Sequence, residues 1–305
     1  MLLTDEVRAT CAQIAGQARS VRIDVDAAAN VQPADPPALD PERHYLEGSP
    51  ADVADYMLAL DAINFGSGWF PTLRKRTAHG EPVSGYFTVS WSLADHVRMD
   101  GPPTSAWLAN VSTQEIATIL DQAPDNELMG LYAQALRSLG RFLGGDVSQG
   151  VQPHVPWRAL DLVEQAGGSA ERLAGMLARG MAMFDDRGFY KRAQIVPNDL
   201  ALAGVAEFLD LDRLTIFADN LVPHVLRCDG VLVYDDELAA RIDRGEHLTL
   251  GGVEREIRAC AVHACELISQ RTGIPPRTID TWLWTRGQSP EYKARPRHRC
   301  RSVFY

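Results

Sequence analysis

The sequence lacks the features that would direct a protein to a membrane or out of the cell. Its start, Met1-Leu2-Leu3-Thr4-Asp5, has neither the basic residues nor the apolar run of a signal peptide, and no stretch is long enough to span a membrane. The 5 cysteines are an odd number without a CxxC pair, so the sequence does not indicate a disulfide framework. We therefore expect a soluble, cytoplasmic protein with reduced, mostly buried thiols.

The short motifs of many cofactor and metal enzymes are also missing. There is no P-loop, no GxGxxG segment after a strand, and no HExxH or GxSxG pattern. His263 and Glu266 have the spacing of a carboxylate-bridged metal motif, but no second such pair occurs, and the spacing of Cys260 and Cys265 does not match a zinc site. We predict that the protein binds no metal and no organic cofactor.

Positive charge is scarce in this chain. Its 30 lysines and arginines face 40 aspartates and glutamates, which gives a formal net charge of -10. An acidic surface repels polyphosphate, so a long DNA or RNA partner is disfavoured. A single nucleotide held in one pocket is compatible with this charge.

Most of the chain shows helical periodicity. Residues 28–50 are rich in proline and aspartate and should be mainly loop, whereas residues 83–91 fit either a short strand or a helix. The candidate helices cover residues 5–19, 50–63, 104–109, 113–121, 127–143, 157–166, 169–178, 199–209, 213–217, 220–228, 235–244, 253–272 and 275–284. Asn198-Asp199 is interpreted as a helix start, because short polar residues precede apolar periodicity there.

These helices predict an all-α protein with a minor β part. No repeat of fixed period and no long linker interrupts the chain. We predict a single compact domain over residues 1–305, in which residues 1–43 form an N-terminal helix and a Pro- and Asp-rich loop. We also expect the protein to be a monomer.

Several acidic residues lie beside turns and aromatic residues. Asp219 closely follows Phe217 at the junction of two predicted helices, where it could cap the second helix or face a ligand. Asp280 lies at helical spacing from Trp284. The same two alternatives apply to Asp199, and Asp61 precedes a loop rich in glycine and aromatic residues.

Acids combined with aromatic rings suit the removal of a base from a nucleotide. Cleavage of an N-glycosidic bond builds positive charge on the ribose. A carboxylate can stabilise this charge, or it can activate the water that attacks the sugar. Aromatic faces can hold the base. Lys191 and Arg192 could meet a 5'-phosphate, but the sequence by itself slightly favours a solvated surface pair.

Five segments in this order resemble one family, the queuosine salvage proteins or queuosine 5'-phosphate N-glycosylases. They are FGSGWFPTLRK at 65–75, FYKRAQI at 189–195, FADNLVPHVLR at 217–227, EREIRAC at 254–260 and DTWLW at 280–284. The resemblance runs from about His44 to the end of the sequence. The Pro- and Asp-rich residues 28–42 depart from the family pattern, which affects only the N-terminal region.

The resemblance implies a helical fold related to the helix-hairpin-helix DNA glycosylases. It also implies hydrolysis of queuosine 5'-monophosphate to queuine and ribose 5-phosphate, without a cofactor, for salvage into tRNA modification. Asp219 and Asp199 are then the candidate catalytic residues, and which of the two acts on the sugar stays open. The candidate substrate-binding residues are His44, Asp61, Asn64, Phe65, Lys191, Arg192, Phe217, Asp280 and Trp284.

Two other functions remain as alternatives. A protein that binds queuosine or queuine without cleaving it could use the same fold and pocket. A DNA or RNA glycosylase would need to bind a charged backbone and extract a base from the stack, for which a chain of net charge -10 is poorly suited. Queuine carries an amine that is cationic at neutral pH, and this agrees with a pocket rich in carboxylates.

Overall fold

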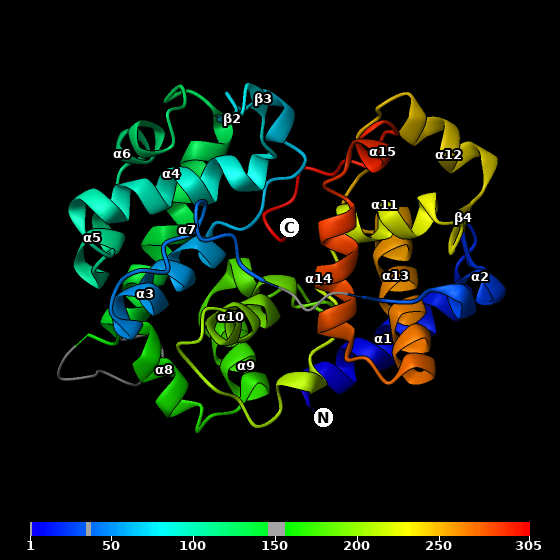
Figure 1. Cartoon of the computed structure of the whole chain (residues 1–305), viewed down its shortest axis with the longest axis horizontal. Coiled ribbons are helices and arrows are strands. Elements are labelled where there is room, and N and C mark those ends of the chain that lie inside the picture. The colour runs from blue at the N-terminus through cyan, green and yellow to red at the C-terminus, as the bar shows by residue number, and fades with distance from the viewer. Residues whose placement is uncertain (1, 35–37, 146–155) are drawn as a thin grey trace.

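The computed structural model describes residues 2–34, 38–145 and 156–305, and most of these residues lie in helices. The helices form two groups that face each other, with α9 and α10 between them (Figure 1). The predicted predominance of helix is confirmed, and the β structure consists of two short two-stranded sheets. In the part of the chain described, no helix combines the length and apolar character needed to cross a membrane.

The first group contains the helices from the N-terminal half of the chain. Its elements are α3 (Pro50–Ala62), the 3-10 helix η1 (Phe70–Thr72), strands β2 (Thr77–Ala78) and β3 (Glu81–Pro82), α4 (Gly85–Asp100), α5 (Ser105–Asn110), α6 (Thr113–Ile119), α7 (Glu127–Gly144) and α8 (Ala159–Gln165). Ser49 begins α3 as predicted, because its side chain accepts a hydrogen bond from the Asp52 amide and Pro50 occupies the first turn. Nearly every residue from Tyr56 to Ala62 is buried, so α3 runs through the core of this group.

The second group joins both ends of the sequence. Its elements are α1 (Leu3–Gln17), β1 (Val21–Ile23), α2 (Val25–Asn30), α11 (Leu221–Cys228), β4 (Leu232–Tyr234), α12 (Asp236–Asp243), α13 (Gly252–Thr272), α14 (Pro276–Arg286) and α15 (Pro290–Lys293). Strand β1 pairs antiparallel with β4, Val21 opposite Tyr234. Val7 and Cys11 on α1 have no exposed surface. The N-terminal segment is therefore part of the packed structure, and it contains β1 and α2 in addition to the expected helix.

Helices α9 (Ala170–Gly180) and α10 (Lys191–Leu202) connect the two groups, with the 3-10 helix η3 (Ala182–Phe184) before α10. Residues 191–200 are buried, so α10 is enclosed on all sides over most of its length. The C-terminal residues enter the space between the two groups from above α10 (Figure 1).

Most predicted helices are confirmed, but three segments differ. Residues 83–91, left open between strand and helix, belong to α4, which begins where Ser84 caps the Phe87 amide. The helix predicted at 199–209 is wrong: α10 starts at Lys191 and ends at Leu202, so Asn198-Asp199 is not a helix start. The helix predicted at 213–217 is also wrong, since residues 211–213 form the 3-10 helix η4 and residues 214–219 are not helical.

The remaining expectations on local structure concern the loop and the thiols. Residues 31–49 are mainly loop as predicted, while α2 extends to Asn30 and residues 35–37 fall outside the described part. All cysteines are unpaired thiols, and all except Cys228 are buried. This agrees with the expected reduced state.

Candidate functional site

A cavity of about 390 Å³ lies between the two groups of helices. Its walls combine aromatic rings with acidic side chains. The rings belong to Phe65, Phe70, Tyr86, Phe87, Phe217, Trp284 and Tyr305, and the acids are Asp40, Asp199, Asp219 and Asp280. Only two cationic side chains, Lys191 and Arg297, are among the described residues that line it. The volume lies within the range typical of small-molecule sites.

The cavity brings together all of the predicted site residues except two. His44, Asn64, Phe65, Lys191, Asp199, Phe217, Asp219, Asp280 and Trp284 line it. Asp61 is fully buried behind the wall, and the Arg192 guanidinium points elsewhere. The lining residues that the sequence analysis missed include Tyr86, Phe87 and Arg297.

Asp219 is held at the start of α11 by the backbone of that helix. One carboxyl oxygen, Oδ1, accepts hydrogen bonds from the Leu221 amide at 2.7 Å and the Val222 amide at 3.0 Å. Both alternatives from the sequence therefore apply at once, because Asp219 caps α11 and also lines the cavity. Within the described ranges Oδ2 has no hydrogen-bond partner, so this oxygen is available to a ligand.

Asp280 projects from α14 into the same space. Its Oδ1 accepts a hydrogen bond from the Phe217 amide at 2.8 Å, which ties α14 to the segment that carries Asp219. Burial raises the pKa of Asp280 to about 8, and the nearby charge of Asp219 acts in the same direction. Asp280 is therefore mainly protonated at neutral pH and can donate a proton.

Asp199 and Asp61 form a second acidic pair, one from α10 and one from α3. Burial raises the pKa of Asp199 to about 6, against the hydrogen bond from Asn198 and the charge of Lys191. Burial and the charge of Asp199 raise the pKa of Asp61 well above its usual range. Both carboxyl oxygens of Asp61 are buried without a hydrogen-bond partner among the described residues. Burial and the neighbouring charge thus both favour the protonated form of Asp61.

Lys191 connects the acids to the loop after α3. Its Nζ donates to the Asn64 carbonyl oxygen at 2.8 Å and to Asn64 Oδ1 at 3.1 Å. Burial lowers the pKa of Lys191 to about 8, although the charges of Asp219, Asp61 and Asp280 oppose this change. The ammonium is therefore positioned by Asn64 and sits within the field of the acidic side chains.

Arg192 is neither a surface residue nor a part of the cavity wall. Its side chain is buried and donates to the carbonyl oxygens of Ala62, Met183 and Val303. The interpretation of Lys191 and Arg192 as a solvated surface pair is wrong, since both are almost completely buried. The guanidinium holds three separate segments together behind the cavity, and its Nε is buried without a hydrogen-bond partner among the described residues.

The aromatic wall is organised around His44. Its Nδ1 lies 2.8 Å from the Asp40 carbonyl oxygen and its Nε2 lies 2.9 Å from the Tyr86 hydroxyl. The rings of Tyr86 and Trp284 meet edge to face at 5.4 Å between centroids. Burial lowers the pKa of His44, so the imidazole is neutral at pH 7. His44 therefore links the loop at residues 38–44 to α4 and fixes the rings that a base could stack on.

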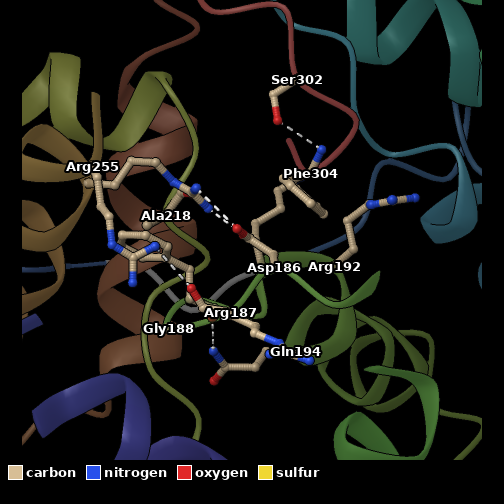
Figure 2. A network of polar contacts seen from close by, with 12 residues as sticks. Asp186, Arg187, Gly188, Arg192, Gln194, Ala218, Arg255, Ser302 and Phe304 are labelled. Atoms are coloured by element: carbon tan, nitrogen blue, oxygen red, sulfur yellow. Dashed lines mark hydrogen bonds and ion pairs between the residues drawn. The ribbon is translucent and has the colours of Figure 1, made fainter. Parts of the chain in front are cut away.

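Buried polar contacts support the other side of the site. Arg258 on α13 donates to the Ala218 carbonyl oxygen at 2.9 Å and forms an ion pair with Asp186. Figure 2 shows this region, with Asp186 near its centre, Ala218 on one side and Arg192, Phe304 and Ser302 on the other. These contacts hold the backbone just before Asp219 in place.

The C-terminal residues complete the cavity. The backbone oxygen of Tyr305 accepts a hydrogen bond from the Gly66 amide at 2.9 Å, and Arg192 donates to Val303 at 2.7 Å. The Tyr305 ring packs against the Arg258 guanidinium at 4.5 Å. Gly68 lies so close to the Cys300 carbonyl that a β-carbon there would be 2.3 Å from its oxygen. The glycines of this loop thus allow the C-terminal segment to pass between the two helix groups.

The described residues contain no group of three or more His, Cys, Asp or Glu side chains that could hold a metal ion. What the cavity does offer is a set of acids with different protonation states. The pKa of Asp280 is about 8 and that of Asp199 about 6, and behind the wall burial raises the pKa of Asp61. Acids whose pKa values are separated in this way are the usual basis of acid and base roles in one site.

Comparison with known proteins gives a consistent result. Residues 44–305 match the family model described as queuosine salvage protein. A queuosine 5'-phosphate N-glycosylase/hydrolase of Sphaerobacter thermophilus is 33% identical, and the alignment covers 98% of this chain and 97% of that protein. Proteins of the same name from Mus musculus and Schizosaccharomyces pombe are each 29% identical, with 86% and 87% of this chain covered. The chain therefore belongs to the queuosine salvage protein family.

Proposed function

We propose that this protein is an N-glycosidase that hydrolyses queuosine 5'-monophosphate to queuine and ribose 5-phosphate. Its relatives are named for this activity. The observation that carries the proposal is the placement of Asp219 and the protonated Asp280 in one cavity, linked through the Phe217 backbone amide and faced by an aromatic wall. A carboxylate for the sugar, a proton donor for the base and rings to hold the base are the parts that the reaction requires.

Asp219 is the residue that we assign to the sugar. Its Oδ2 is available, while two backbone amides fix Oδ1, so the carboxylate has a defined direction. As the C1'–N bond breaks, this carboxylate stabilises the positive charge on the ribose or takes a proton from the attacking water. The water oxygen bonds to C1', and the electron pair of the broken bond leaves with the base.

Asp280 is the residue that we assign to the leaving base. It is protonated at neutral pH, and its Oδ2 is not used by the Phe217 amide. A proton donated from this group to the base neutralises the charge that develops on the leaving nitrogen. Asp199 can then bind the cationic amine of queuine, because its carboxyl group is largely ionised near neutral pH and attracts a positive charge.

The test is the release of free queuine from queuosine 5'-monophosphate by the purified protein. Asp219→Asn keeps the capping oxygen and removes the charge, so turnover should fall by about a hundredfold or more while queuine still binds. Turnover near the wild-type rate would remove Asp219 from the chemistry. Tight binding of queuosine by calorimetry without any base released after long incubation would instead identify a binding protein.

We also propose that the protein acts as a cytoplasmic monomer on free nucleotide, without nucleic acid and without a cofactor. The unpaired thiols and the net charge of -10 support this proposal. We propose a single domain over residues 1–305, which the packing of α1 into the second helix group supports. Light scattering and a titration with tRNA at low salt test these points, and binding that weakens with added salt would contradict the absence of a nucleic-acid partner.

A further inference from the structure

A second concave site lies on the first helix group, apart from the cavity that contains Asp219. This outer groove has a volume of about 640 Å³ and is lined by side chains of α4, α5 and α6. Among the described residues, none lines both the outer groove and the cavity. In Figure 1, α5 and α6 lie on the side of their group that faces away from α14. The volume is again typical of a small-molecule site.

One face of α4 forms a wall of the outer groove. Ser92, Asp95, His96 and Met99 line it, and their spacing of three or four residues places them on the same side of the helix. Ser92 is only 6% exposed, yet its hydroxyl forms no hydrogen bond with another described residue. Met99 in contrast is 78% exposed. A buried hydroxyl normally has a partner, so this one indicates a missing ligand.

The outer groove also has apolar surface. Trp107 of α5 and Ile119 of α6 line it together with Met99, and both are partly buried. The Trp107 ring lies against the His96 imidazole, with 5.8 Å between the centroids and 35° between the planes. An indole ring of this kind can bind both methylene groups and a cation.

The basic side chains of the outer groove are already occupied. Arg76 donates to Asp95 at 2.6 Å, and its guanidinium lies over the Trp91 ring at 4.0 Å from the centroid. Nδ1 of His96 lies 2.9 Å from Asp100. No other lysine, arginine or histidine of the described residues lines the groove. An anionic ligand would therefore find no available cation there.

Three acids in the lining are more weakly compensated. Glu115 caps α6 through Ser112 and forms no ion pair among the described residues. Asp121 pairs with Arg74, but both side chains are mostly exposed, so this contact contributes little. Glu115 and Asp121 are separated by about 9 Å along α6 at a rise of about 1.5 Å per residue. Asp100 lies on the other wall, at the end of α4. The negative charges are thus spread along the groove.

We propose that the outer groove binds an aliphatic polyamine. Its ammonium groups pair with Asp100, Glu115 and Asp121, and its methylene groups pack on the Trp107 ring. The Ser92 hydroxyl accepts a hydrogen bond from an amine between them. Positive charges joined by methylene groups match carboxylates that are separated by apolar surface. A basic peptide offers the same charges, but its backbone amides would lose water without gaining partners on that surface.

Calorimetry with spermine and the full chain tests the site. We expect spermine to bind at low ionic strength and to bind about tenfold more weakly when Glu115→Gln and Asp121→Asn are combined, since two ion pairs are lost. Glutamine keeps the cap with Ser112, and asparagine tolerates the left-handed backbone of Asp121, whose φ is 51°. Urea unfolding verifies that this double variant is folded. Absent spermine binding, or equal affinity of the double variant and the wild type, overturns the proposal.

The matched control removes the same charges from elsewhere on the surface. Asp26→Asn combined with Glu237→Gln changes exposed acids of α2 and α12, which lie outside the outer groove. This variant should bind spermine as the wild type does. If it loses as much affinity as the groove variant, spermine responds only to the net charge of the protein, and the groove is not its site.

A comparison of ligands separates the polyamine from a peptide. Trilysine carries several ammonium groups on a peptide backbone and should bind the wild type about tenfold more weakly than spermine. Trilysine binding that equals or exceeds that of spermine would assign the groove to a peptide segment and refute the polyamine site. None of these measurements uses queuine release, so the inference stands or fails independently of the proposed function.

Discussion

Replacement of Asp280 by asparagine should make the protein more stable and less active. Asp280 is buried on α14, and its pKa is about 8 in the folded protein against 3.8 as the ordinary value. Between these two pH values the unfolded chain has lost a proton that the folded protein retains. Stability therefore falls as the pH rises through this window, because the folded state must hold a group that prefers to ionise in water.

The size of the effect follows from this difference. About three pH units separate the ordinary pKa from pH 7, and each unit corresponds to about 1.4 kcal/mol, so the penalty at pH 7 is on the order of 4 kcal/mol. Asparagine has almost the same shape, keeps the oxygen that accepts from the Phe217 amide, and does not titrate. We expect Asp280→Asn to gain stability relative to the wild type as the pH is raised from 5 to 8.

Denaturant unfolding at several pH values measures this gain. An exposed acid on α2, Asp26, forms no side-chain hydrogen bond or ion pair among the described residues, so Asp26→Asn should follow the wild-type profile. Queuine release measured in parallel should fall by about a hundredfold for Asp280→Asn, since the proton donor is lost. The reasoning is refuted if the stability of Asp280→Asn shows the same pH dependence as that of the wild type.

Two further substitutions test the support of the site. Arg192→Met should lower the free energy of unfolding by about 3 kcal/mol or more, because three buried carbonyl oxygens lose their donor, and a loss below about 1 kcal/mol in urea unfolding would disagree. His44→Phe should raise KM for queuosine 5'-monophosphate more than it lowers kcat, because the hydrogen bond that orients Tyr86 is lost while the acids stay in place. Steady-state kinetics would contradict this if kcat alone changed.

Local sequence patterns were sufficient to predict most helices, and they pointed to acids that line the cavity. Caps such as Ser49 and Ser112 mark real helix starts, because their side chains satisfy free amides of the first turn. The same pattern failed at Asn198 and Asp199. There the Asn198 side chain donates a hydrogen bond to Asp199 Oδ1 at 3.0 Å inside α10. Two polar residues of a buried site therefore give the same sequence pattern as a helix cap. A cap and a polar cluster inside a helix look alike when burial is not known.

The residues missed by the sequence analysis depend on long-range contacts. Tyr86 and Phe87 belong to a segment whose periodicity fits strand or helix equally, and their role comes from packing against Trp284 on a distant helix. Arg297 reaches the cavity because the C-terminal segment passes between the helix groups, where Gly66 binds the backbone of Tyr305. No local pattern near residue 297 specifies where that segment lies.

The acids of the cavity also explain why so many polar contacts lie behind it. Asp280 and Asp61 are buried carboxyls that weaken the fold as the pH rises, and Lys191 is a buried amine. An arrangement of this kind persists only where the surrounding structure holds the backbone firmly. Arg192 and Arg258 do so with hydrogen bonds to backbone carbonyls on both sides of the site. The stability that these arginines contribute therefore allows the acids to keep the separate protonation states that the proposed hydrolysis needs.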